Sequence, residues 1–180
     1  SYVEGVSAQE SDRIIREDIN KLKMSLRRFG NAVKYPQIIL ITEYLSNEAM
    51  LALHAQTNCY ISLERCAGYG LPTHEALAMG NWVVVNNSGG VDQFVDHGRN
   101  GHLIENHLET MEGMTRCPYT NMYTCHSMWK EPDYNQFKKY IRKAYLERPD
   151  NILRQEEFLS TYSYQNVGLQ VKALLEGNNV

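Results

Sequence analysis

The chain has 180 residues, of which 43% are hydrophobic and 22% are charged, and its formal net charge is −3. These values predict a globular protein of one domain with a substantial core. Lysine and arginine form no block longer than the pairs Arg27-Arg28 and Lys138-Lys139. This argues against free-standing nucleic-acid binding, since neutralising phosphates requires a clustered positive face. The longest apolar runs have the length of strands and the N-terminal sequence lacks a signal-peptide pattern, so we expect no membrane span and a cytoplasmic location.

The four cysteines of the chain include no C-x-x-C pair. We therefore expect reduced thiols and no metal site, because closed zinc sites usually contain paired short spacings. The alternative is a zinc site built from Cys117 and the Cys125-His126 pair, with His102 and His107 as nearby histidines.

The first predicted element is an amphipathic helix. Ser7 and Glu10 form a capping box, in which the serine accepts from the backbone N–H of Glu10 and the glutamate reaches back. The apolar residues that follow recur at spacings of three and four, and Gly30 closes the segment. They are Ile15, Ile19, Leu22, Leu26 and Phe29. After Pro36, the continuous apolar run 37–42 predicts a strand that is covered on both faces.

Strands and helices alternate in the middle of the chain. Helices are expected at 47–56, at 72–79 before Gly80, and at about 91–95, and strands at 58–62, 82–86 and 102–104. This order predicts a parallel sheet with right-handed crossovers, that is, an open α/β sheet flanked by helices and half of a doubly wound fold. Such sheets bind ligands at the carboxyl ends of their strands.

The last third of the chain is predicted to be irregular and then helical. Residues 105–132 contain Pro118, Pro132 and many polar residues, which indicates irregular structure. A helix over 133–147 is expected to bury one apolar face, and residues 164–177 are expected to form a closing helix. The face consists of Phe137, Tyr140, Ile141, Ala144 and Tyr145.

A glycine-rich turn follows the strand predicted at 58–62. Gly68 and Gly70 allow backbone angles and close approaches that a β-carbon forbids, and Pro72 suits the first helical position. The N–H groups of residues 73–75 would then point outward from the first helical turn, where the helix dipole favours a diphosphate. Glu75 in that turn could accept two hydroxyls of a ribose. The alternative is a tight strand-to-helix connection in which Glu75 only interacts favourably with the helix dipole.

A second glycine-bearing turn follows the strand predicted at 82–86. The segment Asn86-Asn87-Ser88-Gly89-Gly90 again places small residues and amides between a strand and a helix. Two adjacent strand ends of this kind could share one ligand that contains a diphosphate. The alternative is a plain turn, because Asn and Gly are common turn formers.

These motifs resemble the donor-binding half of the retaining group 1, or family 4-type, glycosyltransferases. The resemblance rests on the turn 68–72, the segment 75–80, the strand 83–85, the pair Gly89-Gly90 and the sequence "VDHGRNGHLI". A Trp-x-Glu-Pro-Asp segment at 129–133 and the sequence "NVGLQVKALLE" resemble one branch of that group. The resemblance implies a Rossmann-like, three-layer α/β/α domain with a parallel sheet, the C-terminal half of a GT-B fold, and we expect 1–180 to form this single domain.

The resemblance also implies a nucleotide-diphosphate sugar as donor substrate, retaining transfer to an acceptor, and neither metal nor other cofactor. The catalytic residues stay unassigned. The donor-binding residues that we expect are Arg65, Gly68, Tyr69, Gly70, Leu71, Glu75, Asn86, Ser88, Gly89 and Gly90. Among them, the amides of Gly70 and Leu71 would hold the diphosphate, and Glu75 matches the second of the family's paired glutamates, which binds the ribose.

The sequence departs from the family pattern at several positions. The first paired glutamate, which contacts the transferred sugar, is replaced by Ala67, and the acidic position after Gly89-Gly90 holds Gln93, with Asp92 beside it. The family's basic residue for the diphosphate has no clear counterpart other than Arg65, whose alternative role is that of a solvent-facing loop arginine.

An N-terminal acceptor domain is expected to be missing from 1–180, so the acceptor site would come from another domain or a partner chain. The first hypothesis is therefore a donor-binding domain that is inactive alone. The second is a non-catalytic nucleotide-sugar-binding or assembly module. A nicotinamide-binding domain is disfavoured, since the turn lacks the third glycine of the G-x-G-x-x-G fingerprint.

Overall fold

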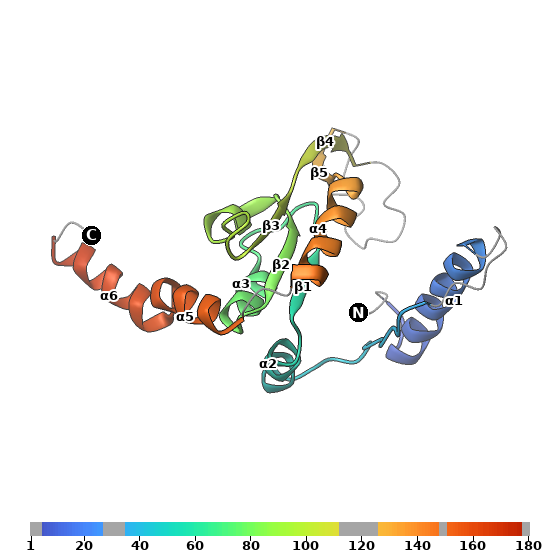
Figure 1. Cartoon of the computed structure of the whole chain (residues 1–180), viewed down its shortest axis with the longest axis horizontal. Coiled ribbons are helices and arrows are strands. Elements are labelled where there is room, and N and C mark those ends of the chain that lie inside the picture. Colours follow the sequence, from blue (N-terminus) through green and yellow to red (C-terminus); the bar gives the residue numbers. More distant parts are fainter. Residues whose placement is uncertain (1–4, 27–34, 112–125, 148–150, 178–180) are drawn as a thin grey trace. The chain divides into compact units, whose positions relative to one another are not determined.

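The computed structural model describes residues 5–26, 35–111, 126–147 and 151–177, the last without the side chains of 151–154. The described residues divide into two units, which we treat separately. One unit contains residues 5–26 and 35–46, and the other contains the described residues from Asn47 onward. Figure 1 shows all elements along the chain.

Helix α1 (Ala8–Leu26) is the main element of the first unit. The hydroxyl oxygen of Ser7 accepts from the backbone N–H of Glu10 at 3.2 Å, which confirms the serine half of the predicted capping box. The carboxylate of Glu10 binds the guanidinium of Arg13, at 2.5 Å from Nη2, rather than reaching back to Ser7. Phe29 and Gly30 lie outside the described residues.

The predicted strand at 37–42 is wrong. These residues form neither helix nor strand, and Ile39 is 77% exposed. The apolar run alone favoured a covered strand, but a strand exists only through hydrogen bonds to a neighbouring strand. The three-stranded sheet of the described residues consists of strands from the second unit alone.

The second unit is built on a parallel sheet of three strands, β1 (Cys59–Ser62), β2 (Trp82–Asn86) and β3 (Gly101–Ile104), in that order. Tyr60 pairs with Val83 across one interface, and Val83 pairs with Gly101 across the other. Helices α2 (Asn47–Ala55) and α3 (Leu71–Ala78) and the short 3-10 helix η2 (Gly89–Gln93) occupy the predicted places between strands. The parallel α/β order predicted from the sequence is therefore confirmed.

Side chains of β2 alternate between two cores, one on each face of the sheet. Val83 and Val85 pack with α3 and with Phe158 of α5 (Asn151–Tyr162). Trp82 and Val84 pack with α4 (Tyr134–Glu147), which Figure 1 shows against the sheet. This is the three-layer, Rossmann-like arrangement that was predicted.

The predicted apolar face of α4 is confirmed at four of its positions and wrong at one. Phe137, Tyr140 and Ile141 are partly buried against the core that contains Ala144. Tyr145, however, is 69% exposed. At about 100° per residue, Tyr145 lies about 80° around the helix from Phe137, beyond the edge of the face that the other four residues form.

The prediction of irregular structure over 105–132 is wrong at both ends of that range. Strands β4 (Asn106–Thr110) and β5 (Met128–Pro132) form an antiparallel hairpin, and Pro118 lies outside the described residues. β4 is polar and mostly exposed, so it lacks the hydrophobic alternation from which a strand is predicted. Helix α6 (Tyr164–Leu175) follows α5 and confirms the predicted closing helix.

Candidate functional site

The carboxyl ends of β1 and β2 lie at one edge of the sheet, because the strands are parallel and Ser62 pairs with Val85. Each strand continues into one of the two predicted glycine turns. The turns touch each other there, since the N–H of Gly90 donates to the carbonyl oxygen of Gly68 at 2.7 Å. The expectation that the two motifs meet at one strand edge is thus met by the geometry.

The first glycine turn ends at Gly70, which adopts the left-handed conformation with φ +88° at the start of α3. A β-carbon there would lie 2.7 Å from Cγ1 of Val91, so the position is reserved for glycine by both conformation and space. The Gly70 carbonyl accepts from the N–H groups of Thr73 at 3.0 Å and His74 at 3.1 Å. These contacts begin the helix.

Only some of the amides that were expected to face an anion are available to one. The N–H groups of Thr73 and His74 are used within the helix, since both donate to Gly70. Among the described residues, no acceptor lies at hydrogen-bond distance from the N–H groups of Gly70 and Leu71, which stand at the helix N-terminus. These two amides are the groups that could bind a phosphate there.

Glu75 is the fifth residue of α3, so the prediction that it lies in the first helical turn is wrong. The helix begins at Leu71, one residue earlier than predicted, which moves Glu75 into the second turn. The Glu75 carboxylate is exposed and lies within electrostatic range of the Tyr60 hydroxyl. Burial raises the pKa of Tyr60, hydrogen bonds to Ser62 and Thr73 oppose this, and the charges of Glu64 and, to a smaller extent, Glu75 add to the rise.

The second glycine turn packs directly on the backbone of the first. Gly89 has φ +70°, and a β-carbon on it would lie 1.6 Å from the carbonyl oxygen of Ala67. A β-carbon on Gly90 would lie 3.0 Å from the Gly68 carbonyl oxygen. Gly89 is therefore needed for the two loops to approach each other, whereas a β-carbon at position 90 would require only a small shift of the first loop.

Asn86 and Ser88 are buried, and their side chains bind protein groups. The Ser88 hydroxyl donates to the carbonyl oxygen of Glu64 at 2.6 Å. Nδ2 of Asn86 donates to the same oxygen at 3.0 Å and to the carbonyl oxygen of Lys130 at 2.8 Å. Oδ1 of Asn86 accepts from Nδ2 of Asn106 at 3.1 Å. In this structure the two side chains tie the strand-end loops together.

Arg65 is held by the β4–β5 hairpin. Its guanidinium forms two hydrogen bonds to the carboxylate of Glu131, one of them at 3.1 Å from Nη2 to Oε1, and it lies 4.4 Å from the ring centroid of Trp129. The hydroxyl of Tyr134 donates to the same carboxylate at 2.6 Å. The Arg65 bond lowers the pKa of Glu131, and the same bond raises the pKa of Arg65. Arg65 is therefore a paired arginine rather than a free solvent-facing one.

Tyr69 joins the glycine turn to the core on the α3 side of the sheet. Its ring lies 5.1 Å from Phe94 and 5.5 Å from His74, measured between centroids. His74 in turn lies 4.9 Å from Phe158, and burial lowers the pKa of His74. The side chain of Tyr69 thus packs the glycine turn against this core, while the residue remains 46% exposed.

Sequence reasoning missed the residues of the hairpin that reach the strand ends. Lys130 donates from Nζ to the carbonyl oxygen of Asn87 at 3.1 Å, and Asn106 donates to the same oxygen at 2.7 Å. The Trp-x-Glu-Pro-Asp segment was the available signal, since it contains Trp129 and Glu131. Nothing in its spacing, however, indicates which loop it contacts.

The alternative zinc site involves Cys117 and Cys125, which lie outside the described residues. Within the described part of the chain, no group of three or more His, Cys, Asp or Glu side chains is arranged to hold a metal ion. His102 lies buried between the sheet and α4, whereas His107 lies exposed on β4.

The glycine turns, Arg65 and the three parallel strands lie within one segment that matches a family model. Residues 29–113 match the family model described as Glycosyl transferases group 1. This segment is similar to the group 1 glycosyltransferases. The resemblance drawn from the motifs is confirmed over residues 29–113, and glycosyl transfer is the general class of function that this match supports. Comparison with curated proteins and with solved structures gave no match. In the described ranges, no helix combines the length and apolar character needed to cross a bilayer.

Proposed function

We propose that the second unit binds a nucleotide-diphosphate sugar at the carboxyl ends of β1 and β2, as the donor-binding part of a retaining glycosyltransferase. The group 1 match supports a sugar nucleotide as the donor class. The proposal includes a diphosphate on the amides of Gly70 and Leu71 and a ribose on the carboxylate of Glu75.

The observation that carries this proposal is the open helix start at Gly70. Two N–H groups without acceptors among the described residues stand at the N-terminus of α3, where the helix dipole adds positive potential. Glu75 lies on the same helix, four residues after Leu71 and therefore about one turn away, with its carboxylate in solvent. A diphosphate and the adjoining ribose require this combination of donors and acceptors.

Amides, rather than a metal ion, would carry the phosphate charge in this proposal, so binding would need no divalent cation. As the bond to the sugar breaks, the same amides would stabilise the charge that develops on the leaving diphosphate. We further propose that transfer requires an acceptor-binding domain, attached or separate, to complete the cleft. A cytoplasmic location fits Cys59 and Cys66, which form no disulfide within the described part of the chain.

A non-catalytic nucleotide-sugar-binding or assembly module is the second candidate, and Ala67 favours it. The side chain at this position is a methyl group, and the Ala67 carbonyl packs against Gly89. An alanine cannot accept hydrogen bonds from the hydroxyls of the transferred sugar. Such a protein would hold the nucleotide and leave the sugar without a charged partner.

Calorimetric titration tests the donor site directly. The chain is titrated with UDP, with GDP and with the matching nucleotide sugars, with and without EDTA. Glu75→Ala is compared with Glu156→Ala, which removes an exposed glutamate from α5. We expect micromolar to millimolar binding that EDTA leaves unchanged. Glu75→Ala should weaken this binding at least about tenfold, because charged hydrogen bonds are lost. Glu156→Ala should bind as tightly as the parent. Binding that both variants share equally, or no binding of any probe, contradicts the proposal.

A further inference from the structure

The β4–β5 hairpin contacts both loops that follow the strand ends. It reaches the first loop through Arg65, whose carbonyl oxygen accepts from the N–H of Lys130 at 3.2 Å and whose guanidinium binds Glu131. It reaches the second loop through Asn87, whose carbonyl oxygen accepts from Lys130 Nζ at 3.1 Å. The hairpin is thus attached to the two loops that carry the glycine turns.

The pair of Glu131 and Arg65 is the best-defined of these attachments. The side chain of Glu131 is 13% exposed and that of Arg65 is 40% exposed, so the pair is partly shielded from water. Two hydrogen bonds join guanidinium and carboxylate, Tyr134 donates to Glu131, and Trp129 lies beneath the guanidinium. Bidentate, charged contacts of this kind fix orientation more strongly than a single surface ion pair.

Arg65 is close in the sequence to the first glycine turn, so a displacement of Arg65 would shift that turn. Ala67 and Gly68 follow Arg65 by two and three residues, and their carbonyl oxygens lie against Gly89 and Gly90. Gly70, which starts α3, is two residues further on. Because the loops fit this tightly, the position of Arg65 affects where the amides of Gly70 and Leu71 point.

The pair also lies outside both hydrophobic cores. Neither Arg65, Glu131 nor Trp129 belongs to the clusters that join β1–β3 to the helices. Removing the Glu131 charge should therefore change the loops more than the sheet. This separation makes a positioning role testable apart from folding.

We propose that Glu131 is a positioning residue of the donor site, which acts through Arg65 to hold the first glycine turn in the geometry that binds a diphosphate. This inference rests on the proposed function for its ligand, but its structural part can be measured without one. Glu131 itself makes no contact with the donor in this proposal.

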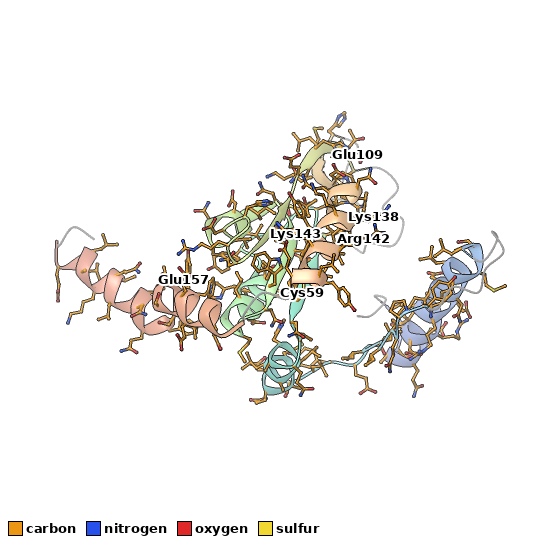
Figure 2. All side chains as sticks on the ribbon, in the orientation of Figure 1. Cys59, Glu109, Lys138, Arg142, Lys143 and Glu157 are labelled. Carbon is orange, nitrogen blue, oxygen red and sulfur yellow. The ribbon has the colours of Figure 1, made fainter. Side chains whose placement is uncertain are left out.

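The test compares Glu131→Gln, Arg65→Gln and the double variant with the control Glu109→Gln. Figure 2 shows Glu109 on the same hairpin, and its side chain is 53% exposed. Affinity for UDP and GDP is measured by calorimetry, the melting temperature by calorimetric scanning, and backbone exchange by mass spectrometry of peptides covering 63–70 and 86–90.

We expect Glu131→Gln to weaken nucleotide binding about fivefold to tenfold, as coupling between contacting groups predicts. In Glu131→Gln, backbone exchange should rise at 63–70 while the melting temperature stays close to that of the parent. The control Glu109→Gln should match the parent in affinity, melting temperature and exchange. The double variant should bind no more weakly than Arg65→Gln alone, because the two residues act as one unit. Aspartate at position 131, in Glu131→Asp, should restore part of the affinity.

Two results overturn the inference. One is unchanged affinity and unchanged exchange in Glu131→Gln, and the other is a loss of affinity that accompanies faster exchange throughout the sheet. If the parent binds no nucleotide, the proposed function fails by itself. The exchange data then decide alone: faster exchange confined to 63–70 supports the positioning role, and unchanged exchange there refutes it.

Discussion

His102 makes the second unit sensitive to acid. The side chain is 1% exposed, and neither ring nitrogen has a hydrogen-bond partner among the described residues. The ring stacks on Tyr140 at 4.2 Å and lies 5.1 Å from Trp82. Burial lowers the pKa of His102 to about 4, and the positive charges of His97 and Lys143 act in the same direction. Figure 2 shows Lys143 on α4.

The direction of the pH effect follows from the lowered pKa. In the unfolded chain the ring takes a proton near pH 6.5, whereas in the folded chain it stays neutral until about pH 4. The stability that depends on a neutral ring is therefore present above pH 6.5 and is lost as the pH falls from 6.5 to 4. The full difference is on the order of 3 kcal/mol, and the loss between pH 7 and pH 5 is about 2 kcal/mol.

The assay is urea unfolding at pH 7, 6 and 5, followed by the fluorescence of the two tryptophans, both of which lie in the second unit. The variant His102→Leu has similar volume and cannot be protonated, so it should lose about 2 kcal/mol less than the parent over this range. The control His107→Gln removes an exposed histidine from β4 and should follow the parent. Parallel curves for the parent and His102→Leu would refute the reasoning, since all other titrating groups are shared.

Two further substitutions test the glycine turns. Gly89→Ala should destabilise the fold by about 2–4 kcal/mol in urea unfolding, because its β-carbon would overlap the Ala67 carbonyl and its φ is positive; a change below about 0.5 kcal/mol would show that the loops separate easily. Ala67→Glu should raise the affinity for a nucleotide sugar relative to the bare diphosphate by about threefold or more, because a carboxylate can accept from sugar hydroxyls; an unchanged ratio in calorimetry favours the non-catalytic module.

The sequence predicted the parallel sheet well because burial leaves a clear pattern there. The run Trp82–Asn86 is buried at every position, and a continuous apolar stretch bounded by turn residues is the expected signal for such a strand. The same signal misled at 37–42, where Ile39 is exposed and no strand forms. The local hydrophobic pattern indicates which side chains a segment could bury. Whether the segment forms a strand depends on hydrogen bonds to strands that are distant in the sequence.

The hairpin shows the opposite failure. β4 and β5 are held by pairing between residues such as His107 and Glu131, which are far apart in sequence and mostly polar. Neither strand has a local hydrophobic periodicity that predicts it, so the prolines and polar residues of 105–132 indicated irregular structure instead. The partners of Arg65 were missed for the same reason, since they arrive from this hairpin.

The motifs indicate where the two strand-end loops meet, but not which of their side chains bind other protein groups. Glycine, serine and asparagine at strand ends suit a phosphate contact and a tight loop contact equally well. The structure uses Ser88, Asn86 and Gly89 for the second purpose. The amides of Gly70 and Leu71, which the family resemblance implied as the diphosphate donors, have no hydrogen-bond acceptor among the described residues. A motif therefore indicates where chain segments meet, and the groups that face the ligand are those which folding has not already used.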